Sequence, residues 1–99
     1  MFVYFLAPSF LMAISLSSNS LNISWGETTL KDGEIVLFKI FYKGQFEKQI
    51  SLLVKQAGNS SSTIDNLKPS TLYEISICSE TTIGDSLCRH MSKITNDGK

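Results

Sequence analysis

Two cysteines, Cys78 and Cys88, are the residues of this 99-residue chain with the clearest capacity for covalent chemistry. Apolar and polar residues alternate from Tyr73 to Ile77, which predicts a strand that carries Cys78 on its outward face. Cys88 falls on the next predicted strand, so the pair suits a cross-strand disulfide that closes the loop around Gly84. Such a bond requires an oxidising compartment. Two unrelated free thiols are the alternative interpretation.

Two asparagines stand in the acceptor pattern for N-linked glycosylation, in Asn22-Ile23-Ser24 and in Asn59-Ser60-Ser61. Asn22 is flanked by apolar residues on a predicted strand, so its side chain is expected on the outer face. Asn59 falls in a polar predicted loop. Sequons this short also arise by chance, but their outward placement and the paired cysteines together favour a glycoprotein of the secretory pathway, at the cell surface or outside the cell.

Groups for catalysis, metal binding or cofactor binding are scarce. The single histidine, His90, falls on a predicted edge strand and is interpreted as a surface side chain. The sequence has no glycine-rich phosphate loop and no serine nucleophile elbow, and two cysteines with one histidine do not make a zinc site. Nine basic and nine acidic side chains balance, which argues against nucleic acid as a partner. We therefore expect a domain that is not an enzyme, with no metal, no cofactor and no small-molecule substrate.

Strand patterns recur along the chain, whereas helix patterns are rare. The sequence predicts strands over residues 21–25, 35–42, 47–54, 63–67, 72–79 and 87–94, with polar loops at 26–33, 57–62 and 80–86. The loops 26–33 and 80–86 are expected at one end of the molecule. Strands of this length and spacing predict an all-β sandwich.

The first twenty residues allow two interpretations. The stretch from Met1 to Leu16 is mostly apolar, as in a signal peptide, and small residues stand at a spacing suited to cleavage. Pro8 interrupts this stretch, however, and no Lys or Arg precedes it. We favour a first strand of the domain, with Leu11, Ala13 and Leu16 facing the core, because cleavage would remove an edge strand from a small core.

The predicted core uses alternate positions of the strands. The residues expected to be buried there are Trp25, Phe38, Ile40, Tyr42, Leu67, Tyr73, Ile75 and Ile77. Leu37 and Phe41 fall on the opposite face of their strand and are expected to point out of the sandwich. Neighbouring exposed apolar groups are typical of interfaces, so this pair is a candidate partner surface. Scattered surface apolar residues, covered by lysine stems, are the alternative.

Several of these motifs occur at separations that resemble the fibronectin type III family. They are Trp25, then Gly33-Glu34-Ile35-Val36-Leu37-Phe38-Lys39-Ile40-Phe41-Tyr42, then Leu67-Lys68-Pro69-Ser70-Thr71-Leu72-Tyr73, with Gly84 eleven residues after Tyr73. In such sandwiches a tyrosine at the start of the sixth strand enters the core and bonds back to upstream backbone. Two departures are mild: Phe38 stands where a tyrosine is commoner, and Thr81 where an asparagine is usual.

The resemblance implies an all-β, immunoglobulin-like β-sandwich with seven antiparallel strands in two sheets. It implies a fibronectin type III domain over residues 8–95, with residues 1–7 as a leader or gene-model remnant and residues 96–99 as a linker. It implies a non-catalytic extracellular module that serves adhesion, protein–protein interaction or spacing within a larger cell-surface or matrix protein. The expected partners are another protein or neighbouring fibronectin type III repeats, with a membrane reached only through the parent chain. The alternatives are an ectodomain repeat of a receptor-type protein tyrosine phosphatase, because the residues around Pro69, Tyr73 and Gly84 are similar to such repeats, and a cytosolic structural repeat.

Overall fold

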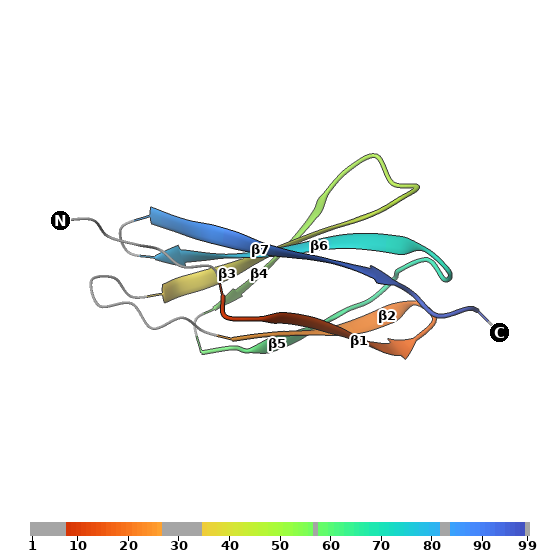
Figure 1. Cartoon of the computed structure of the whole chain (residues 1–99), viewed down its shortest axis with the longest axis horizontal. Coiled ribbons are helices and arrows are strands. Elements are labelled where there is room, and N and C mark those ends of the chain that lie inside the picture. Colours follow the sequence, from red (N-terminus) through yellow and green to blue (C-terminus); the bar gives the residue numbers. More distant parts are fainter. Residues whose placement is uncertain (1–7, 27–34, 57, 82–83, 99) are drawn as a thin grey trace.

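The computed structural model describes residues 8–26, 35–56, 58–81 and 84–98. These residues form seven strands and no helix: β1 (Leu11–Ser17), β2 (Ser20–Trp25), β3 (Ile35–Gly44), β4 (Ser51–Gln56), β5 (Ser61–Ile64), β6 (Leu72–Thr81) and β7 (Gly84–Ile94). They pair antiparallel in two sheets, in the orders β1-β2-β5 and β4-β3-β6-β7. Figure 1 shows the two sheets as stacked layers. The predicted immunoglobulin-like sandwich is confirmed.

The hydrophobic core lies between the two sheets and follows the strand period of two. The buried apolar residues are Leu21, Ile23, Trp25, Phe38, Ile40, Ile64, Leu67, Tyr73, Ile75 and Ile77. The rings of Trp25 and Phe38 meet across the sheets, with centroids 5.4 Å apart and planes tilted by 55°. Tilted aromatic pairs at this distance are favourable beyond their buried area. The core is therefore fixed by an aromatic contact between β2 and β3.

Tyr42 is not part of this buried set, contrary to the sequence-based expectation. It is half-buried and packs against the margin of the core. Tyr42 lies two positions before the end of β3, where the hairpin to β4 rises away from the three-stranded sheet (Figure 1). The opposite sheet therefore does not cover this ring as it covers Phe38 and Ile40.

The first strand forms as predicted, but one of its side chains faces the other way. Leu11 and Ala13 pack against the core, whereas Leu16 is 58% exposed. Strict alternation places Leu11, Ala13 and Ser15 on one face, and the register with β2 shifts between Ser15 and Ser17. The expectation that Leu16 faces the core was therefore wrong.

Several strands begin or end elsewhere than predicted. β4 starts at Ser51 because a turn comes first, in which the Gly44 amide donates to the Glu47 carboxylate over 2.8 Å. β5 ends at Ile64, so Leu67 is buried outside any strand. β6 and β7 extend to Thr81 and Gly84, and most of the predicted loop 80–86 is a strand hairpin. Residues 1–7, almost all of the loop 26–33, and residues 82–83 lie outside the described residues. The expectation that the loops 26–33 and 80–86 lie at one end of the molecule therefore stays a prediction.

The turn before β6 anchors both Tyr73 and the C-terminal segment. The Lys68 amide donates a 2.9 Å hydrogen bond to the Tyr73 hydroxyl, which is the bond expected of a tyrosine corner. Ser70 adopts a positive φ of 50°. Its amide donates to the Asn96 carbonyl over 3.0 Å, and its hydroxyl donates to the Asp97 carboxylate over 2.6 Å. The chain after β7 is thus tied to this turn.

Candidate functional site

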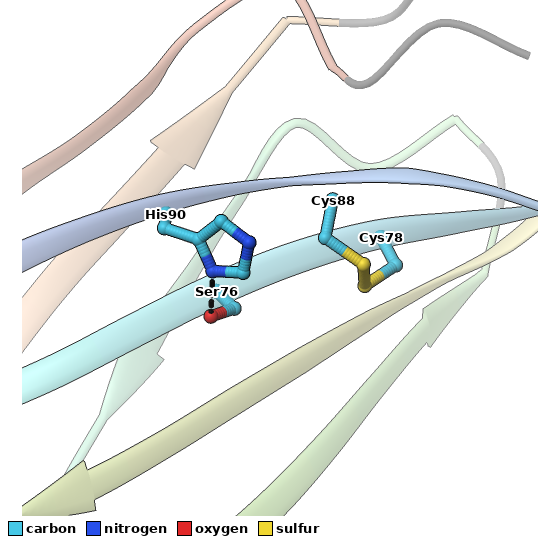
Figure 2. The surroundings of a disulfide bond; sticks show 4 residues. All are labelled: Ser76, Cys78, Cys88 and His90. Atoms are coloured by element: carbon cyan, nitrogen blue, oxygen red, sulfur yellow. Dashed lines mark hydrogen bonds between the residues drawn. A yellow bond between two sulfur atoms is a disulfide. The ribbon is translucent and has the colours of Figure 1, made fainter.

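The β6–β7 hairpin carries the one covalent cross-link among the described residues. Cys78 and Cys88 are directly opposed in the register and form a disulfide, with their Cα atoms 4.3 Å apart (Figure 2). Cys78 is on the outward face of β6, yet only 7% of it is exposed. Its cross-strand neighbours are Cys88 on β7 and Lys39 on β3. The disulfide therefore lies on the outside of the sandwich, with Cys78 buried and Cys88 half-buried.

The same register brings Ser76 and His90 together, a pair that sequence spacing did not reveal. The His90 Nδ1 atom lies 2.6 Å from the Ser76 hydroxyl oxygen (Figure 2). A serine and a histidine at this distance are two parts of a nucleophilic site, which also needs a third group that orients the base. No such third partner of His90 occurs among the described residues, and the pair is exposed. We interpret it as a cross-strand surface pair.

Metal binding finds no support in the described part of the chain. No group of three or more His, Cys, Asp or Glu side chains is gathered there in a way that could hold an ion. Both cysteines are oxidised and do not act as thiolate ligands. Within the same residues, no helix has the length and apolar character needed to cross a membrane.

The two sequon asparagines lie in different surroundings. Asn22 is on β2, the middle strand of the three-stranded sheet, and its side chain is half-buried on the outer face. Asn59 is exposed between β4 and β5, where its side-chain amide donates to the Gln56 carbonyl over 2.9 Å. Both therefore lie where the sequence predicted, on a strand face and in a loop.

The outer face of the four-stranded sheet carries apolar side chains from β3 and β4. Leu37 and Phe41 lie on this face but are half-buried rather than freely exposed. The more exposed apolar groups are Leu52 and Val54 of the edge strand β4. Leu52 is directly opposed to Phe41. The candidate surface therefore extends from Phe41 onto β4 rather than toward Leu37, and we define the β4 face as Phe41, Leu52 and Val54.

A hollow of about 270 Å³ adjoins the β4 face, under the β3–β4 hairpin. Its apolar lining includes Phe41, Ile50 and Leu72, and its polar rim includes Lys43 and Glu74. The hairpin rises away from the three-stranded sheet (Figure 1), and the lining of the hollow also includes Ser76 of β6. An apolar floor with a rim of both charges is a surface that a protein side chain can enter.

A lysine of β3, Lys39, borders the β4 face. Lys39 lies between Leu37 and Phe41 on β3 and is opposed to Val54. Its ammonium group is 3.4 Å from the Glu80 carboxylate on β6. This ion pair contributes little stability at the surface, but it directs the Lys39 charge toward β6. The exposed side chains that β4 contributes to this face, Leu52 and Val54, are apolar.

The comparison with known proteins gives a consistent result. The chain matches the fibronectin type III domain model over residues 6–95. It is 31% identical over 85 residues to the cell adhesion molecule Dscam2 of Drosophila melanogaster, an alignment that covers 82% of this chain and 4% of that protein. The chain thus spans a small fraction of this relative.

Solved structures with the same fold are numerous. The chicken CNTN1 FN1–FN3 domains are 24% identical, with a TM-score of 0.82, over 96% of this chain and 33% of that one. The third fibronectin III domain of the human KIAA0343 protein is 14% identical, with a TM-score of 0.83, over 98% of this chain and 86% of that one. These likenesses concern the fold. With its two-sheet topology, its tyrosine corner and the match over almost its whole length, the chain belongs to the fibronectin type III domain family.

Proposed function

We propose that this domain is a non-catalytic protein-interaction module of an extracellular or cell-surface protein. Its role is adhesion or spacing beside neighbouring fibronectin type III repeats. The relative Dscam2, a cell adhesion molecule, supports this role. The Cys78–Cys88 disulfide supports the compartment, because such bonds persist in oxidising surroundings and are rare in the cytosol. A cytosolic structural repeat is correspondingly disfavoured.

The observation that carries the proposal is the β4 face together with its hollow. Leu52 and Val54 are about half exposed on an edge strand, where apolar side chains are normally avoided. Phe41 continues the same surface toward the hollow. A half-buried aromatic residue with flanking aliphatic groups has the composition of an interface centre. We infer that a partner protein covers this face, with one of its side chains in the hollow.

The test is a substitution on this face with a matched control on the other sheet. We expect the double variant Leu52→Glu with Val54→Glu to fold and to lose at least about tenfold in partner affinity, because two apolar contacts become charges. The control is Met12→Glu with Ile14→Glu, which places the same two charges on exposed apolar positions of β1. The measurement is binding of the multimerised full chain to a panel of cell-surface ectodomains, including a second copy of itself.

Three results would contradict the proposal. The first is that the β4 variant keeps every interaction of the unaltered chain. The second is that the unaltered chain binds no ectodomain of the panel. Loss of binding in both the β4 variant and the β1 control would also count against it, because the effect would then not belong to the β4 face.

A further inference from the structure

The outer face of the three-stranded sheet carries a second row of exposed apolar side chains. Met12, Ile14 and Leu16 alternate along β1 and are 50%, 53% and 58% exposed. We call this row the β1 stripe. It lies on an edge strand, and an uncovered apolar edge strand invites pairing with other chains. Something in the native protein must therefore cover it or hold other chains away.

The centre of the β1 stripe lies directly beside the Asn22 sequon. Ile14 is the cross-strand partner of Asn22, and Thr63 of β5 is the partner on its other side. Directly opposed side chains have Cβ atoms about 4.5–5.5 Å apart. The sequon serine, Ser24, is likewise opposed to Met12. A group attached to the Asn22 amide would thus begin within contact distance of the stripe.

We propose that an N-linked glycan on Asn22 lies across Met12, Ile14 and Leu16 and keeps this face from associating with other chains. The inference rests on the proposed extracellular function, because the modification belongs to the secretory pathway. In the reaction, the Asn22 Nδ2 atom bonds to the anomeric carbon of a lipid-pyrophosphate-linked oligosaccharide. The bond from that carbon to the pyrophosphate oxygen breaks, the lipid pyrophosphate leaves with the electron pair, and the amide nitrogen loses one proton.

The chemistry of the first sugar suits this surface. An N-acetylglucosamine ring has C–H groups on its faces and an acetyl methyl group, while its hydroxyl groups point outward around the rim. The C–H faces can cover the β1 stripe and remove apolar area from water, and the hydroxyl groups keep contact with solvent. Toward β5 the neighbouring residues are Thr63 and Ser61, which offer little apolar surface. The apolar side of the sheet is therefore the side on which the sugar is held.

The second sequon provides an internal control. Asn59 lies outside the strands, is exposed, and bonds to the backbone of Gln56 rather than facing an apolar row. A glycan there has no stripe to cover. The Asn59→Gln variant removes a glycan of the same kind, and it should leave self-association unchanged.

The experiment expresses the full chain behind a heterologous secretion signal in eukaryotic cells, as wild type and with Asn22→Gln, Asn59→Gln or Ser24→Ala. Peptide mapping gives the occupancy of each sequon. Light scattering against concentration gives self-association, and fluorescence of a hydrophobic dye gives apolar exposure. Ser24→Ala removes the acceptor pattern while keeping Asn22, so it replaces Asn22→Gln if that variant does not fold.

The inference predicts that Asn22 is occupied and that loss of its glycan raises dye fluorescence several-fold and produces concentration-dependent oligomers. Asn59→Gln should behave as wild type. Adding Ile14→Lys to Asn22→Gln should restore the monomer, because a charge then interrupts the β1 stripe.

Three results would overturn the inference. In the first, Asn22 is unoccupied while Asn59 is occupied. In the second, Asn22 is occupied, but loss of its glycan changes neither light scattering nor dye fluorescence. In both cases an oxidised cysteine pair and an occupied Asn59 leave the proposed extracellular function standing. If neither sequon is occupied and both cysteines are free thiols, the inference and the proposed compartment fall together.

Discussion

Replacing Trp25 with alanine is expected to lower the free energy of unfolding by about 3–5 kcal/mol. Trp25 is 1% exposed and is the largest fully buried side chain in the described part of the chain. Its ring contacts Phe38 across the two sheets at 5.4 Å. Alanine would leave a cavity that rigid strands on both sides cannot fill, and a small domain has little stability to lose.

The matched control is Trp25→Phe, measured by urea unfolding beside Trp25→Ala. The indole Nε1 atom is buried and has no hydrogen-bond partner among the described residues. Phenylalanine therefore removes no hydrogen bond and keeps an aromatic contact with Phe38, so the loss should be clearly smaller than for alanine. An alanine variant with the wild-type urea midpoint would show that Trp25 does not hold the sheets together.

Loss of the Cys78–Cys88 disulfide should lower the free energy of unfolding by about 2–3 kcal/mol, because the bond restricts the unfolded chain. The cross-linked residues are ten positions apart, so the closed loop is short and the entropic effect is moderate. The variant is Cys78→Ala with Cys88→Ala. Alanine is preferred to serine because Cys78 is buried, and a hydroxyl there would lack an assured partner.

Reductant provides the control for this second prediction. The wild-type protein should lose stability on reduction, whereas the double alanine variant should have the same urea midpoint with and without reductant. Equal midpoints for the oxidised and reduced wild type would mean that the cross-link adds nothing to the fold. Mass spectrometry after thiol alkylation establishes which state is measured.

The strand period explains why so much of the fold could be predicted from the sequence. On β6 the apolar residues stand at every second position from Tyr73 to Ile77, and a period of two assigns each one to a face without further information. The same reasoning placed Phe38 and Ile40 inside and Leu37 and Phe41 on the other face. The expectation that Leu16 faces the core departed from this alternation, which places Leu16 with Met12 and Ile14 on the outer face, where the structure has it.

The candidate surfaces depend on contacts between strands that are distant in sequence. Cys78 was expected on the outward face and lies there, yet its burial depends on neighbours from β3 and β7. The hollow beside Phe41 depends on the angle at which the β3–β4 hairpin leaves the sandwich (Figure 1). Likewise, the register of β2 with β1 places Ile14 beside Asn22. None of these angles or registers can be read from a single strand.

The most direct test of the central claim is the intact mass of the full chain after secretion from a eukaryotic cell, with and without reductant, alkylating agent and glycosidase. An extracellular fibronectin type III module should carry Cys78 and Cys88 as a disulfide that resists alkylation until it is reduced, and its mass should fall on glycosidase treatment. An unmodified chain with two alkylatable thiols would contradict the extracellular setting and return the cytosolic structural repeat as the better account.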